Sequence, residues 1–130
     1  MSKYVSDTMA LVLYLEKRKM PAKAKQIFSA AEQGEHEIYI PIMVMAEIGY
    51  LSEKGRIQTT LGEVEQKMAR DKNFKEEPMD LAFVKASFQI DDIPELHDRL
   101  IAGTAKALGL EIISNDPFMT QSVHVATVWK

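Results

Sequence analysis

The chain contains no cysteine, which excludes disulfide bonds and thiolate metal sites and is compatible with a reducing compartment. It also lacks any stretch that approaches the roughly 18 apolar residues of a membrane span. No basic segment followed by an apolar run stands at its N-terminus, so no targeting peptide is indicated. We therefore expect a soluble, cytoplasmic protein with no membrane contact.

An excess of positive charge is also missing. The chain has 16 Lys and Arg against 19 Asp and Glu, a net charge of −3. A protein that bound nucleic acid through phosphate neutralisation alone would normally be basic. If this chain handles nucleic acid, a metal ion or a local basic patch must offset its carboxylates. Residues 17–19 (Lys-Arg-Lys) and Lys67, Arg70 and Lys72 are candidate RNA contacts, although such charge runs are usually solvated helix ends.

The residues that are present fit one domain over residues 1–130 with a substantial core. Hydrophobic residues make up 46% of the chain and charged residues 27%, which is ordinary for a globular protein and does not indicate disorder. The sequence shows no internal repeat, low-complexity tract or linker. We therefore search for function within a single folded unit.

Short β-favouring runs alternate with helical patterns along the whole chain. The predicted strands, of which the third is the weakest, are residues 3–6, 37–40, 74–79, 110–113 and 126–129. The predicted helices are residues 8–18, 22–33, 42–54, 60–71, 80–89 and 95–108. Such alternation predicts an α/β fold: a three-layer α/β/α sandwich around a mainly parallel sheet of four to five strands.

Two acids stand out at the start of the chain and in its most apolar helix. Asp7 ends the first strand and precedes a helix, where open α/β sheets place ligands; it could equally be a helix N-cap. Glu47 lies in a helix that is apolar on nearly every side, with no Lys or Arg three or four positions away. An unpaired buried carboxylate is costly, so Glu47 should face a partner or a cavity, unless it lies on a narrow solvent-facing stripe.

Two further acids have similar settings. Asp98 lies in the first turn of its helix and shares a face with Ile101 and Ala102, although an acid there also suits the helix dipole. Asp116, in Asn-Asp-Pro after a predicted strand, could be a turn residue. Each acid alone is weak evidence, but all four sit near strand ends or on apolar helices.

Four converging carboxylates would have a definite chemical consequence. Carboxylates within about 5 Å of one another repel, and their pKa values rise unless a cation intervenes. Oxygen ligands suit Mg²⁺ or Mn²⁺. Such an ion makes its bound water a better nucleophile and offsets charge on a phosphate. The pattern therefore predicts a metal site suited to phosphodiester hydrolysis.

Four segments of the chain follow one another in a characteristic order: Tyr-Val-Ser-Asp-Thr-Met-Ala at 4–10, Ala-Glu-Ile at 46–48, His-Asp-Arg-Leu-Ile-Ala-Gly-Thr-Ala at 97–105 and Ser-Asn-Asp at 114–116. Together they resemble a known family, the PIN domain, and in particular the VapC-type toxin ribonucleases of prokaryotic toxin–antitoxin pairs. The resemblance spans nearly the whole chain, and the segment at 97–105 is its most specific part. Gly103 stands where Ala is commoner in the family, which should matter only for packing.

The resemblance implies a Mg²⁺- or Mn²⁺-dependent endoribonuclease that acts on single-stranded RNA, with an antitoxin protein as partner and a homodimer as its assembly. It assigns the acidic quartet to Asp7, Glu47, Asp98 and Asp116. In that assignment the three Asp side chains hold the metal, and Glu47 orients or deprotonates the attacking water. Glu47 is also counted among the metal-binding residues. Thr8 and Ser114 match small hydroxyl residues that support the quartet.

Two other functions are compatible with parts of the pattern. A phosphatase of the haloacid-dehalogenase type also begins with an Asp at a strand end, but its chemistry needs a second Asp two positions on, where this chain has Met9. A catalytically weak PIN-like module that binds RNA or protein would keep the fold without the reaction. The response to a divalent metal distinguishes that module from a nuclease.

Overall fold

The computed structural model describes all 130 residues, Met1 to Lys130, around one five-stranded sheet. Its strands are β1 (Ser2–Ser6), β2 (His36–Pro41), β3 (Phe74–Glu77), β4 (Glu111–Ile113) and β5 (Thr127–Val128). They lie in the order β3-β2-β1-β4-β5, and every neighbouring pair is parallel. The predicted sheet is therefore confirmed, including its weakest strand.

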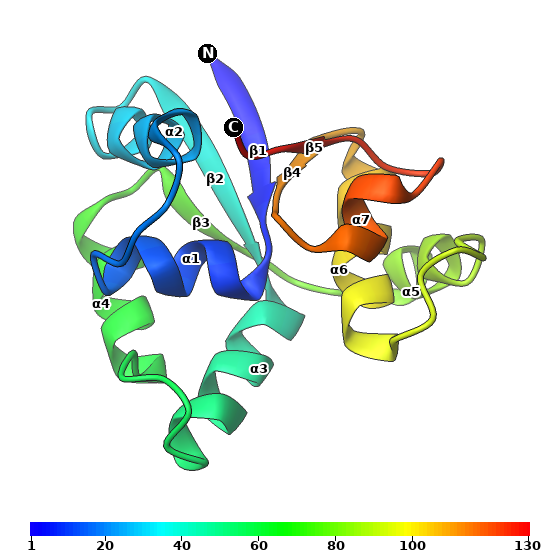
Figure 1. Cartoon of the computed structure of the whole chain (residues 1–130), viewed down its shortest axis with the longest axis horizontal. Helices are drawn as coiled ribbons and strands as arrows, with labels where there is room; N and C mark the ends of the chain where they lie inside the picture. Colours follow the sequence, from blue (N-terminus) through cyan, green and yellow to red (C-terminus); the bar gives the residue numbers. More distant parts are fainter.

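Helices cover both faces of this sheet. They are α1 (Thr8–Leu15), α2 (Ala22–Glu32), α3 (Ile42–Glu53), α4 (Leu61–Arg70), α5 (Leu81–Ser87), α6 (Leu96–Leu108) and α7 (Pro117–Gln121). Figure 1 shows α1 and α2 on one side of the strands and α6 and α7 on the other, which makes the three-layer α/β/α sandwich. No helix is both long and apolar enough to cross a membrane.

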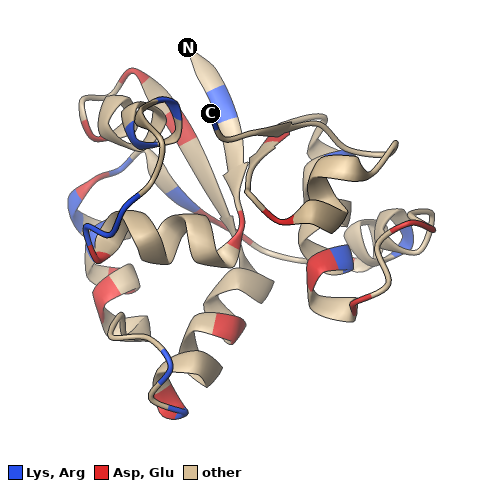
Figure 2. Ribbon diagram, viewed as in Figure 1, with Lys and Arg blue, Asp and Glu red and all other residues tan.

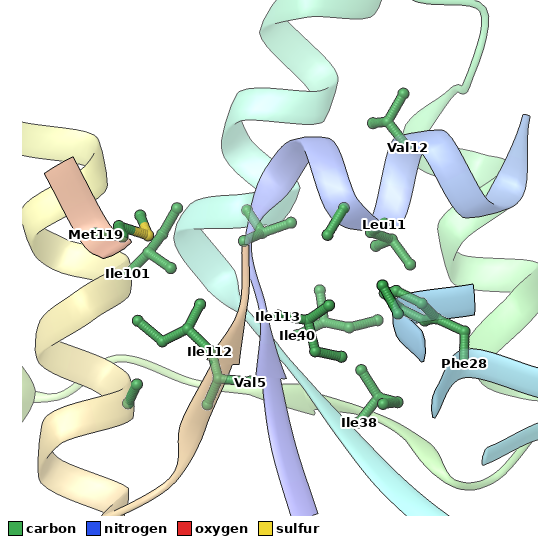
Figure 3. Close-up of a cluster of buried hydrophobic side chains, with 14 of the residues drawn as sticks. Val5, Leu11, Val12, Phe28, Ile38, Ile40, Ile101, Ile112, Ile113 and Met119 are labelled. Atoms are coloured by element: carbon green, nitrogen blue, oxygen red, sulfur yellow. The ribbon is translucent and has the colours of Figure 1, made fainter. Parts of the chain in front are cut away.

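The core follows the alternation of side chains along each strand. Ile112 lies with Ile101 and Met119 on one face, whereas the next residue, Ile113, lies on the face covered by α1 and α2 (Figure 3). β1 is the central strand, and the chain adds β2 and β3 on one side of it and then β4 and β5 on the other. The carboxyl end of β1 therefore opens a crevice of the kind where α/β proteins bind ligands. The sheet order thus places the end of β1 at the centre of a potential site.

Two elements differ from the sequence-based prediction. Helix α1 ends at Leu15 and not at residue 18, because Lys17 takes a left-handed backbone conformation (φ 55°) and the Arg18 N–H donates to the Leu13 carbonyl at 2.9 Å. The sequence predicts a turn at residues 114–117, but Pro117 begins the short helix α7, since proline is well suited to the first position of a helix.

Helices α5 and α6 approach each other closely at Gly103. A Cβ atom on Gly103 would lie 1.9 Å from the Ser87 hydroxyl oxygen, which is far too close for any contact. The Ser87 hydroxyl is itself fixed, since it donates to the Phe83 carbonyl at 2.8 Å. The glycine at this position is therefore explained by packing.

Candidate active site

The four acids come from four different elements and line one cavity. Asp7 follows β1, Glu47 lies on α3, Asp98 is in the first turn of α6, and Asp116 precedes α7. All four line a cavity of about 420 Å³ that also contains Thr8. In Figure 2 acidic residues (red) stand at the end of β1, on α3, at the start of α6 and before α7.

Asp7 is both a helix cap and part of this cavity. Its Oδ1 accepts a hydrogen bond from the Ala10 N–H at 2.8 Å, which confirms that Asp7 is the N-cap of α1. The side chain is nevertheless buried, with the residue only 7% exposed. Burial raises the pKa of Asp7 to about 6, although hydrogen bonds with Ser114 and Ala10 oppose the rise; the charges of Asp116 and Glu47 add to it.

Glu47 faces a partner across the cavity. The Thr8 hydroxyl donates to Glu47 Oε1 at 2.6 Å and thereby links the start of α1 to the middle of α3. No Lys, Arg or His forms an ion pair with Glu47. The second carboxylate oxygen, Oε2, is left without a partner in the protein and is available for the chemistry of the cavity.

Asp98 and Asp116 are both in surroundings that are unfavourable for a charged carboxylate. Burial raises the pKa of Asp98 to about 7, and the charges of Asp116, Glu95, Glu47 and Asp7 add to the rise. The Asp116 N–H donates to the Ser114 hydroxyl at 3.0 Å, but Asp116 Oδ2 is buried without any hydrogen-bond partner. A buried carboxylate oxygen without a partner is costly unless a cation or a proton meets it.

These features fit a divalent cation. The cavity offers carboxylate, hydroxyl and amide oxygens, and no Lys, Arg or His lines it. An all-oxygen donor set with surplus negative charge suits Mg²⁺ or Mn²⁺ better than a softer metal. The unpartnered Asp116 Oδ2 is one position at which such an ion would relieve an unfavourable burial.

The quartet is more open than a fully closed metal cage. One group of three potential ligands in the protein has its atoms within 4.8 Å of one another, and it lies elsewhere: Asp91, Asp92 and His124. Hydrogen bonds within the protein account for that second group, since Asp92 accepts from the Ser122 hydroxyl and His124 Nε2 lies 2.9 Å from Asp91 Oδ1. An ion in the quartet would therefore keep several of its waters, as Mg²⁺ usually does.

Sequence reasoning did not single out two other residues of the cavity, Asn115 and Trp129. Asn115 directly precedes Asp116 in the predicted turn, so its place next to a candidate metal ligand indicates that it lies near the site. Trp129 is the only tryptophan, and it reaches the cavity only because β5 pairs with β4. No local pattern in the sequence reveals such a contact.

The chain matches the family model of the PIN domain over residues 4–120. No curated protein sequence matches it. Among solved structures it is similar to VapBC2 from Rickettsia felis bound to a DNA fragment from its promoter, with a TM-score of 0.74 and 16% identity over 98% of this chain and 99% of that one. DNA-bound VapBC from Salmonella typhimurium gives a TM-score of 0.70 at 16% identity, covering 98% of each chain. A toxin–antitoxin complex from Klebsiella pneumoniae gives 0.64 at 19% identity, covering 96% of this chain and 95% of that one.

Proposed function

Because this chain belongs to the PIN domain family, we propose that it is a Mg²⁺- or Mn²⁺-dependent endoribonuclease that cleaves single-stranded RNA, and that it is the toxin of a toxin–antitoxin pair. One observation carries the proposal: four carboxylates line a single cavity with no basic side chain to neutralise them. Such an arrangement is unfavourable for a module that needs only to be stable, and it is useful to a protein that binds a divalent cation.

In this proposal Asp7, Asp98 and Asp116 hold the ion, directly or through water. Their carboxylates are suited to this role because their positions are fixed by the fold: Asp7 by capping α1, Asp98 by the first turn of α6 and Asp116 by its backbone bond to Ser114. A bound Mg²⁺ or Mn²⁺ would supply charge stabilisation for the phosphate and would make a nearby water more acidic.

Glu47 would orient the attacking water and accept its proton. With Oε1 held by the Thr8 hydroxyl, the free Oε2 is the atom that takes the proton. The water oxygen would then attack the phosphorus in line, the bond to the 3′ oxygen would break, and the departing 3′ oxygen would take a proton from solvent water, so that no covalent intermediate forms. The products would be a 5′-phosphate and a 3′-hydroxyl, as the family resemblance implies.

The partners follow from the same proposal. A similar structure is a toxin–antitoxin complex, and we extend this to the present chain as an expectation of an antitoxin partner. A homodimer in the cytoplasm is the assembly that we expect. Co-expression with the protein encoded by the adjacent gene, followed by co-purification, tests the antitoxin directly.

An RNA cleavage assay tests the catalytic proposal. Purified protein is incubated with an unstructured RNA pool and Mg²⁺ or Mn²⁺, and the new 5′ ends are captured by a ligation that requires a 5′-phosphate. We expect Asp7→Asn and Asp98→Asn each to lower cleavage by more than about 100-fold. The matched control is Asp91→Asn, an exposed carboxylate outside the cavity, which should leave cleavage unchanged. Cleavage that survives both quartet changes would refute the site.

A further inference from the structure

A second cavity of about 550 Å³ adjoins the acidic one. The two cavities share Leu13 of α1. The charged residues that line the second cavity are Lys17, Arg18, Lys25, Lys67, Arg70 and Glu32. In Figure 2 basic residues (blue) gather at the far end of α1 and along the loop that follows it, away from the central acidic residues. Two basic segments separated by about fifty positions in the sequence thus meet in what we call the basic cavity.

The cations of the basic cavity fall into two kinds. Lys67 is 5% exposed and pairs with Glu32 and, at 2.8 Å, with Asp71, so its charge is neutralised within the protein. The prediction that Lys67 binds RNA therefore finds no support. Lys17 and Lys25 are exposed and form no ion pair. These two ammonium groups are free to bind an anion.

Arg18 and Arg70 are intermediate cases. Each lies 3.5 Å from a carboxylate, Arg18 from Glu16 and Arg70 from Asp71. Both carboxylates have other donors, because Glu16 accepts from Thr59 and Asp71 is bonded to Lys67. The Arg18 and Arg70 side chains are 50% and 69% exposed, and pairs this long contribute little, so both guanidinium groups can turn to an external phosphate.

We infer that the basic cavity binds backbone phosphates of the same single-stranded RNA whose scissile phosphate lies in the acidic cavity. The identity of the anion rests on the proposed function. A chain with a net charge of −3 and four clustered carboxylates repels RNA, so it needs cations close to the site of cleavage. The shared residue Leu13 makes the two cavities neighbours, and Leu13, Leu15 and Met20 supply apolar surface beside the cations for sugars or bases.

The backbone of Lys17 provides a clean variant for the test. Its positive φ of 55° at the end of α1 is a conformation that glycine adopts without strain and other residues do not. Lys17→Gly should therefore remove the cation and leave the protein as stable as before or more so. Lys25 is exposed on α2, where alanine is a good helix former, so Lys25→Ala should also be tolerated.

The experiment measures binding of a fluorescein-labelled, unstructured RNA of about 20 nucleotides across a series of KCl concentrations, without divalent ions so that no cleavage occurs. For a single strand, every phosphate that the protein no longer neutralises lowers the salt dependence of log K by about 0.7, so the Lys17→Gly/Lys25→Ala double variant should lower it by about 1.4. Affinity at about 0.1 M salt should fall roughly 10-fold. The matched control is Lys3→Ala/Lys85→Ala, which changes the net charge equally at exposed positions outside both cavities.

The outcomes separate this inference from the proposed function. Equal losses of affinity in the double variant and the control overturn the inference, because only the overall charge of the protein would then affect binding. No loss of affinity in either variant also overturns it, because neither Lys17 nor Lys25 would then contact the RNA. Binding of poly-glutamate in place of RNA also overturns it, in favour of an acidic protein segment as ligand. If the variant behaves as expected while the wild type cleaves no RNA with Mg²⁺ or Mn²⁺, the phosphate site stands and the nuclease proposal falls.

Discussion

The two adjoining cavities use carboxylates in opposite ways. In the acidic cavity, burial raises the pKa of Asp98 to about 7, and the neighbouring carboxylates add to the effect. Beside the basic cavity, the ammonium group of Lys67, which lines that cavity, holds the pKa of Asp71 below its usual value. Asp71 thus stabilises the fold in its charged form, whereas charged Asp98 destabilises it. A charged carboxylate beside Lys67 thus contributes to stability, whereas charged carboxylates in the acidic cavity reduce it unless a cation binds there, as proposed.

Of the changes that test this contrast, a substitution of Lys67 should alter the free energy of unfolding most. Lys67→Met removes the cation that Glu32 and Asp71 share and leaves two carboxylates beside each other at the edge of the core. Breaking a buried pair by removing one partner costs about 3 kcal/mol or more, so the free energy of unfolding should fall by that amount. Urea denaturation followed by circular dichroism measures the loss. A variant as stable as the wild type would show that the pair is replaceable by apolar packing.

Addition of Mn²⁺ should have the next largest effect, at the other cavity. At a concentration about 100 times its dissociation constant, Mn²⁺ should stabilise the wild type by about 2.7 kcal/mol. Trp129 lines the acidic cavity and is the only tryptophan, so its fluorescence reports binding and unfolding in one sample. Asp7→Asn should abolish most of the shift, and Lys17→Gly should keep it. An equal shift in Asp7→Asn would mean that the metal binds elsewhere, for example at Asp91, Asp92 and His124.

The pH dependence of stability should show the smallest effect. Asp7 and Asp98 have folded-state pKa values of about 6 and about 7, above their ordinary value of 3.8. The folded state therefore binds protons more tightly than the unfolded one, and metal-free protein should gain stability as the pH falls from about 7 to about 5. Buried Asp7 alone should contribute about 1.4 kcal/mol over this range, and solvent screening at the partly exposed Asp98 reduces its addition, so the gain should be about 2 kcal/mol.

The same titration has an internal check at lower pH. Asp71 has a lowered pKa, so its contribution is present above its unfolded pKa and is lost as the pH falls below about 4. Stability should thus pass through a maximum between these windows. In Asp98→Asn the gain between pH 7 and 5 should shrink while the loss below pH 4 remains. A wild-type curve that falls steadily from pH 7 would contradict the crowding of the quartet.

Local patterns in the sequence were sufficient for the sheet and for selecting four acids, which line one cavity in the structure and whose catalytic role stays a prediction. A β-favouring run that ends on Asp7 and continues as an apolar helix is visible within ten residues. The helical pattern around Asp98 is equally local. Helix α7 was not predicted, because Asn-Asp-Pro is equally typical of a turn and of a helix that begins with proline. The pairing of Lys67 with Glu32 was not predictable, because the two residues lie 35 positions apart. The basic cavity depends on that same long-range packing of α1, α2 and α4.

The contact between Gly103 and Ser87 limits how this chain can evolve. Trimming Ser87 to glycine would not make room for alanine at position 103, because the Ser87 Cα itself lies 2.6 Å from where the new Cβ would be. Only a separation of the two helix backbones would relieve the clash, and that shift would move the segment that carries Asp98. Neither a substitution of Gly103 alone nor one combined with Ser87→Gly is therefore tolerated at the present helix spacing. Sequences that descend from this one should keep the glycine for as long as they keep the spacing of α5 and α6.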